Sequence, residues 1–133
     1  EFQADLGCKC VWFITPDLYR NALIGKTKDA IRKNLGQGTN YKFIIPQSGA
    51  VNPKEVLLQM AESTSGKIHI NDSIPADEFR GLAVTDYLIM NAESGEPQVF
   101  LELPVPERGY WIKVEPEAAM GLRIRFSKYE QEP

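Results

Sequence analysis

Cysteine and histidine are scarce in this chain, which limits both its covalent and its metal chemistry. The 133 residues include two cysteines, Cys8 and Cys10, and one histidine, His69. The cysteines are too close in sequence to join distant parts of a fold, and on a strand both would lie on one face. A zinc site takes four ligands, so carboxylates would have to complete a set that starts with these three residues. We therefore expect buried thiols in a reducing, cytoplasmic compartment, with no metal site and no cofactor.

Long apolar runs and an excess of positive charge are also missing. No stretch of about 18 consecutive apolar residues is present, and the start Glu1-Phe2-Gln3 is not a charged leader followed by an apolar stretch. The sequence therefore predicts no membrane or secretion signal. Its 15 basic and 18 acidic residues give a net charge of -3. This balance disfavours nucleic-acid binding by the domain alone, because such binding needs a basic face.

The composition is that of a soluble globular protein, with 43% hydrophobic and 25% charged residues. The length suits a single domain spanning residues 1–133, and the absence of an initial Met predicts a fragment of a longer chain. Apolar runs and alternation predict six strands, at residues 8–15, 41–45, 67–71, 83–90, 98–103 and 110–114. Helical spacing predicts helices over 18–35, from Asn52, over 75–82 and from Glu117.

Local signals sharpen three of these elements. Asn52 can cap a helix whose first position is Pro53, and Glu55 follows three residues after the cap. The turn-rich link 91–97 predicts that the strands on either side pair as an antiparallel hairpin. The tail over 117–130 fits a helix, although residues 122–126 alternate like a strand. We favour the helix because its spacing extends over more residues.

The order of these elements predicts an α/β fold with a mixed, mainly parallel sheet and helices on both faces. The strand at 8–15 is almost wholly apolar from Cys10 onward, as expected for a strand buried on both faces of a parallel sheet.

The segment from Phe79 to Asp86 carries a resemblance to one half of the phospholipase D-like superfamily. That family's signature is a His, any residue, a Lys, four residues and an Asp; here Phe79 stands at the His position, Gly81 at the Lys position, and only Asp86 matches. The stretches 15–19 and 34–46 are also similar to bacterial stand-alone or regulator-fused domains of this type. The resemblance covers about residues 8 to 130.

The resemblance implies a phospholipase D-like fold without its chemistry. Phosphodiester cleavage in that family needs an imidazole nucleophile, a second imidazole as acid, and lysines that neutralise developing charge. The only imidazole here, His69, lies one strand too early, with Asn71 and Ala76 where the Lys and Asp would be. Because related folds pair two halves, the resemblance also implies self-association.

Polar residues at the carboxyl ends of the expected parallel strands form the candidate ligand site. In parallel α/β sheets, ligands bind beyond these ends. The six candidates are Thr15, Asp17, Gln47, Ser48, Asn71 and Asp72. None is basic, so they suit a neutral or cationic small-molecule effector better than a phosphate. Asp86 is interpreted as a strand-end carboxylate that bonds local backbone.

Three functions stay open. The favoured one is a non-catalytic sensing, ligand-binding or dimerisation module of a larger bacterial regulatory or signalling protein. One alternative is a phosphodiesterase or another hydrolase whose site is not recognisable from sequence. The other is a protein-interaction scaffold.

Overall fold

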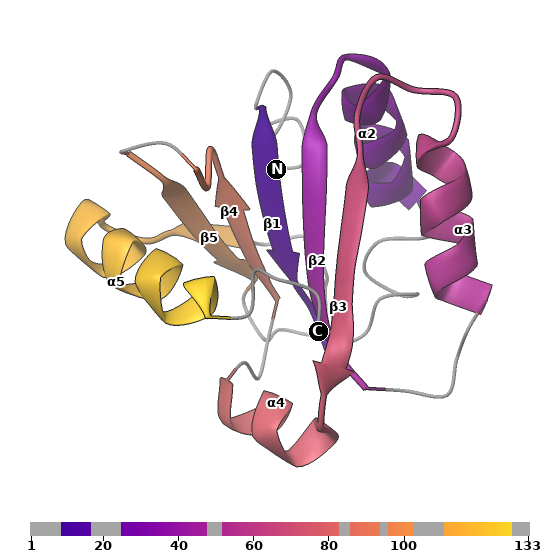
Figure 1. Cartoon of the computed structure of the whole chain (residues 1–133). Coiled ribbons are helices and arrows are strands. Elements are labelled where there is room, and N and C mark those ends of the chain that lie inside the picture. Colours follow the sequence, from indigo (N-terminus) through magenta and orange to yellow (C-terminus); the bar gives the residue numbers. More distant parts are fainter. Residues whose placement is uncertain are drawn as a thin grey trace.

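The fold is a mixed sheet with helices on both of its faces, as the computed structural model shows (Figure 1). The structure describes residues 9–16, 25–47, 52–82, 86–93, 96–102 and 111–128. Its strands are β1 (Cys10–Ile14), β2 (Asn40–Pro46), β3 (Ile68–Ile74), β4 (Tyr87–Met90), β5 (Gln98–Glu102) and β6 (Trp111–Lys113). Its helices are α2 (Gly25–Gly36), α3 (Asn52–Ala61), α4 (Ala76–Leu82) and α5 (Pro116–Ser127).

The six strands follow the order β3-β2-β1-β4-β5-β6. β1 pairs with β2, and β2 with β3, in parallel. The pairs β1–β4, β4–β5 and β5–β6 are antiparallel. The predicted α/β class and mixed sheet are therefore confirmed, whereas the predicted mainly parallel character is not.

The path through α4 explains why the sheet changes direction. A parallel strand requires a crossover that returns the chain to the opposite end of the sheet. α4 has seven residues, which makes it only about 10 Å long. It lies beyond the end of β3 (Figure 1), so the chain re-enters the sheet at the edge that it has just left. β4 must then run antiparallel to β1.

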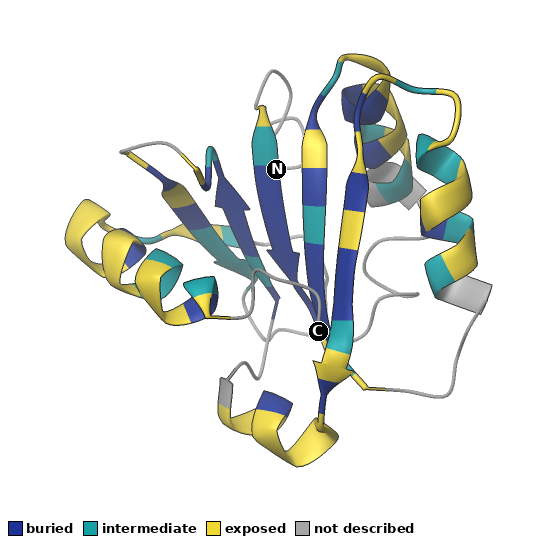
Figure 2. Ribbon diagram, in the orientation of Figure 1, coloured by how far each residue is buried: buried dark blue, intermediate teal, exposed yellow. Residues whose placement is uncertain are grey.

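Alternation along the strands divides the core into two layers. On the side that we call the α3 face, strand residues such as Phe13 and Phe43 pack with Ile31 and Leu35 of α2 and with Leu57 of α3. On the opposite side, the α5 face, the strands contribute Trp12, Ile14, Ile44, Ile89 and Val99, and the helices contribute Phe79, Ala119 and Phe126. β1 is buried on both faces, as its apolar sequence predicted (Figure 2).

Several predicted elements are confirmed within the described ranges. α3 begins at Asn52, and β4 and β5 form the expected antiparallel hairpin. The tail forms α5, with Ala119 and Phe126 buried against the sheet. Residues 18–24 of the predicted first helix and 83–85 of the predicted fourth strand lie outside the described residues. In the part of the chain that the structure describes, no helix is both long and apolar enough to cross a bilayer.

Two glycines shape the connections next to β2 and β3. Gly38 follows α2 with a φ of 92°, a left-handed conformation that glycine adopts without steric cost. Gly66 precedes β3 and donates its amide to the Leu35 carbonyl at 3.0 Å. A Cβ at Gly66 would clash with the Thr39 carbonyl oxygen and lie 3.0 Å from that of Leu35. Close backbone approach therefore requires glycine at position 66.

Candidate functional site

The carboxyl ends of the three parallel strands meet at one edge of the sheet, where β4 also begins. Of the six residues predicted to line this edge, the structure describes Thr15, Gln47, Asn71 and Asp72. Asp17 and Ser48 lie outside the described residues. The four described residues do not act as one group, because their side chains differ in burial and in bonding.

Thr15 lies opposite Asp86 at this edge. Ile14 pairs with Tyr87 in the antiparallel β1–β4 ladder, so the residue that follows β1 meets the residue that precedes β4. Thr15 is 0% exposed and Asp86 is 2% exposed. Backbone hydrogen bonds fix both positions: the Thr15 amide donates to Ile44 at 3.1 Å, and the Glu102 amide donates to Asp86 at 3.1 Å. Thr15 and Asp86 are therefore neighbours at the end of the β1–β4 ladder, and both residues are buried.

Asn71 shapes the end of β3. It pairs with Ile44 in β2, just before an irregularity in the β2–β3 register. Its Oδ1 accepts hydrogen bonds from the Ser73 amide at 3.2 Å and from the Ser73 hydroxyl at 3.0 Å. Asn71 is buried, and its carboxamide oxygen stabilises this local turn. We conclude that it supports the edge more than it offers an acceptor to a ligand.

Asp72 and Gln47 occupy the outer rim. The Asp72 carboxylate bonds Lys54 of α3 at 2.9 Å, and both side chains are about one-third exposed, at 33% and 35%. Such a pair contributes only about 0.5 kcal/mol, yet it directs Asp72 toward α3. The Gln47 amide donates to Ile74 at 2.7 Å, and the residue itself is exposed. Gln47 is thus available at the surface of the edge.

Asp86, interpreted from the sequence as a strand-end carboxylate, directly precedes β4 and is buried. Its burial depends on the β1–β4 pairing, which local sequence does not reveal. The connections also diverge at this point, since β1 leads to α2 on the α3 face while α4, on the α5 face, leads into β4. In open α/β sheets, such a divergence creates a crevice that binds ligands. The Thr15–Asp86 pair is therefore the candidate site.

A second polar cluster lies on the α5 face, around the fully buried indole of Trp12. The Arg123 guanidinium of α5 stacks 4.0 Å from the ring centroid, and Lys42 Nζ lies 5.7 Å from it. Arg123 Nε also donates to the Ala92 carbonyl. These contacts attach α5 to β1 and to the turn that follows β4.

Cys10 lies beside this cluster and is held in its neutral form. Burial, followed by the negative charge of Glu93, raises the pKa of the Cys10 thiol from 9.0 to about 11. Lys42 and Arg123 oppose this shift only in part. A thiol with this pKa is almost wholly protonated at neutral pH, and the thiolate is the nucleophilic form. Cys10 is therefore suited to packing.

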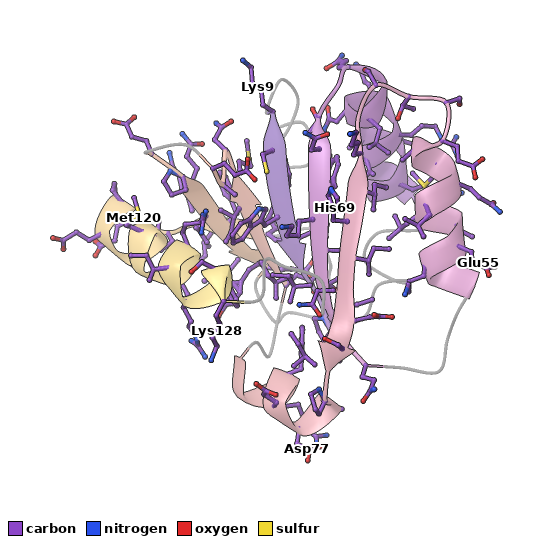
Figure 3. The ribbon with its side chains drawn as sticks, viewed as in Figure 1. Lys9, Glu55, His69, Asp77, Met120 and Lys128 are labelled. Carbon is purple, nitrogen blue, oxygen red and sulfur yellow. The ribbon has the colours of Figure 1, made fainter. Side chains whose placement is uncertain are left out.

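The residues that carry the phospholipase D-like resemblance do not form a catalytic group. Phe79 lies on α4, is 1% exposed and packs in the core of the α5 face. Gly81 is exposed on the same helix, and its carbonyl accepts a hydrogen bond from Arg125 at 2.9 Å. His69 is exposed on β3 (Figure 3). Among the described residues, no three His, Cys, Asp or Glu side chains gather where they could hold a metal ion.

A separate hollow of about 400 Å³ lies between α5 and the strands β5 and β6. Its lining mixes charged, polar and apolar residues: Glu96, Pro97, Gln98, Lys113, Val114, Pro116, Ala119 and Met120. The charged side chains at its rim, Glu96 and Lys113, are exposed. Its polar groups therefore lie in water, unlike those of the Thr15–Asp86 pair.

No protein-family model, curated protein or solved structure matches the chain. The phospholipase D-like resemblance therefore stays a prediction.

Proposed function

We propose that this chain is a non-catalytic sensing module of a larger bacterial regulatory protein. In this proposal it binds a small neutral or cationic molecule at the edge of the sheet where β1 ends and β4 begins. The observation that supports it is the buried pair formed by Thr15 and Asp86 where the connections of the sheet diverge. Small-molecule sites commonly combine an apolar wall with a few polar groups, and Thr15 and Asp86 are the polar groups that this proposal uses.

The charge of the site determines which ligands it favours. The oxygens of a carboxyl group accept hydrogen bonds and attract cations, and they disfavour phosphates and other anions. Thr15 adds a hydroxyl that both donates and accepts. Amines, guanidinium compounds and polyols are therefore the preferred ligand classes.

Two observations favour a sensing role over the alternative of a hydrolase. Phe79, at the position that the resemblance assigns to the nucleophile, fills the apolar core and has no atom that can attack phosphorus. The Cys10 thiol, whose pKa is raised to about 11 by burial, is a poor nucleophile at neutral pH.

A thermal-shift screen tests the proposal. The panel contains diamines, guanidinium compounds, polyols and nucleoside monophosphates. We expect a member of the first three classes to raise Tm, and Thr15→Val and Asp86→Asn to abolish that rise. Asp77→Asn is the matched control, because the Asp77 side chain is 94% exposed on α4. Binding of the nucleotides alone, or amine binding that survives both site variants, would contradict the proposal.

An activity assay distinguishes the sensing proposal from the hydrolase alternative. The purified chain is incubated with generic phosphodiesters beside its His69→Ala variant. We expect no turnover above buffer in either protein. Turnover that disappears in His69→Ala would replace the sensing proposal with an enzymatic one.

A further inference from the structure

The outer surface of α5 exposes two large apolar side chains, although the helix already buries its inner side. Met120 is 38% exposed and Ile124 is 64% exposed, whereas Ala119 and Phe126 face the core. Figure 1 shows α5 on the flank of the molecule that lies away from α2 and α3. Successive residues of a helix are about 100° apart around its axis, so the residues opposite the buried side form a stripe along the helix. We call it the outer α5 stripe: Glu117, Met120, Gly121, Ile124 and Lys128.

The outer α5 stripe is complementary to a second copy of itself that runs in the opposite direction. It begins with the acidic Glu117 in the first turn and ends with the basic Lys128 directly after the helix. Gly121 and Ile124 lie between them, and a Cβ at Gly121 would meet no atom within 4 Å. Figure 3 shows Met120 and Lys128 at opposite parts of the helix.

We propose that the outer α5 stripe binds the same stripe of a second copy of this chain. The two helices run antiparallel about a two-fold axis that passes between Leu122 and Arg123. Ile124 then lies over the open space at the partner's Gly121, and Glu117 lies opposite the partner's Lys128. Each contact occurs twice, as the symmetry of such an interface requires.

Charge complementarity favours a second copy of this chain as the binding partner. In an antiparallel pair, the acidic first turn of one helix meets the basic end of the other. The two helix dipoles then point in opposite directions, which is also favourable. A parallel pair would instead bring Glu117 against Glu117 and Lys128 against Lys128. A membrane surface would select an apolar helix with a basic polar side, whereas this stripe has an acid at one end. The interface is independent of the ligand proposed for the sheet edge.

Sedimentation equilibrium over a concentration series tests the interface. We expect a reversible dimer of the full 133-residue chain and a monomer for Ile124→Glu. Gly121→Leu fills the space that Ile124 of the second copy would occupy, so we expect this variant to be monomeric as well. Leu58→Glu is the matched control, because Leu58 is 43% exposed on α3, on the other face of the sheet. Circular dichroism confirms that each variant is folded.

Charge reversal tests the antiparallel register. Glu117→Lys and Lys128→Glu each replace two attractions by two repulsions, and we expect the dissociation constant to rise roughly tenfold in either variant. The double variant restores opposite charges across the interface and should return to the original affinity. A double variant that stays weak would overturn the antiparallel register. A monomeric wild-type chain throughout the series, or a dimer that survives Ile124→Glu, would overturn the interface itself.

Discussion

Replacing Phe79 by histidine would restore the residue that the phospholipase D-like signature places there, and we expect it to destabilise the fold without creating activity. Phe79 is 1% exposed. It packs from α4 into the core of the α5 face, among residues that include Ile44, Ile74 and Phe126. An imidazole at this position would exchange an apolar ring for a polar one inside an apolar cluster.

The expected loss follows from the burial of this side chain. Phe79→Leu keeps an apolar group of similar size and should cost about 1 kcal/mol. Phe79→His loses apolar burial and also buries a polar ring, so it should cost about 3 kcal/mol. Burial lowers the pKa of the introduced imidazole below its unfolded value of about 6.5. The unfolded state then binds more protons, so Phe79→His should lose up to about 2 kcal/mol more by about pH 5.

Urea unfolding at neutral and acidic pH measures these differences. We expect the midpoint of Phe79→His to lie about 1 M below that of Phe79→Leu near pH 7. The gap should widen as the pH falls through the unfolded pKa of the imidazole. Equal midpoints for the two variants at both pH values would refute the burial of Phe79. Phosphodiester turnover by Phe79→His would refute our interpretation of the position as structural.

Three further predictions concern packing at other positions. Because its pKa is raised from 9.0 to about 11, Cys10 in a Cys8→Ser background should react with iodoacetamide about a hundredfold more slowly in the folded than in the urea-unfolded chain. Equal rates would contradict this assignment. Gly66→Ala forces a backbone clash and should lower the free energy of unfolding by about 2 kcal/mol, measured in urea. Gly81→Ala, whose Cβ would meet no atom within 4 Å, is its control and should cost nothing. Arg123→Met removes the guanidinium stacked on the indole of β1 and should cost about 1 kcal/mol; an unchanged urea midpoint would show that this contact does not hold α5.

Local signals in the sequence were sufficient for the elements whose ends they define. Asn52 and Pro53 predicted the start of α3, which begins at Asn52. The link at 91–97 predicted the β4–β5 hairpin, and helical spacing predicted α5. In each case the favourable local conformation agrees with the burial pattern of the complete fold.

Features that depend on contacts between distant segments were not predictable in this way. The direction of β4 depends on where α4 packs, and seven helical residues do not reveal that position. The burial of Asp86 arises from pairing between β1 and β4, far apart in the chain. Asp72 was predicted at the site, but its bond to Lys54 directs it toward α3. The stacking of Arg123 on Trp12 likewise joins the two ends of the described chain.

The most direct test of the proposed sensing site is an NMR titration of the isotope-labelled chain with the amine, guanidinium compound or polyol that raises Tm most. We predict that the largest amide shifts map to Thr15, Gln47 and Asp86, at the edge where β1 ends and β4 begins. We also predict that a folded Asp86→Asn variant loses these shifts. Shifts confined to the hollow beside α5, or no shift with any member of the three ligand classes, would contradict the account.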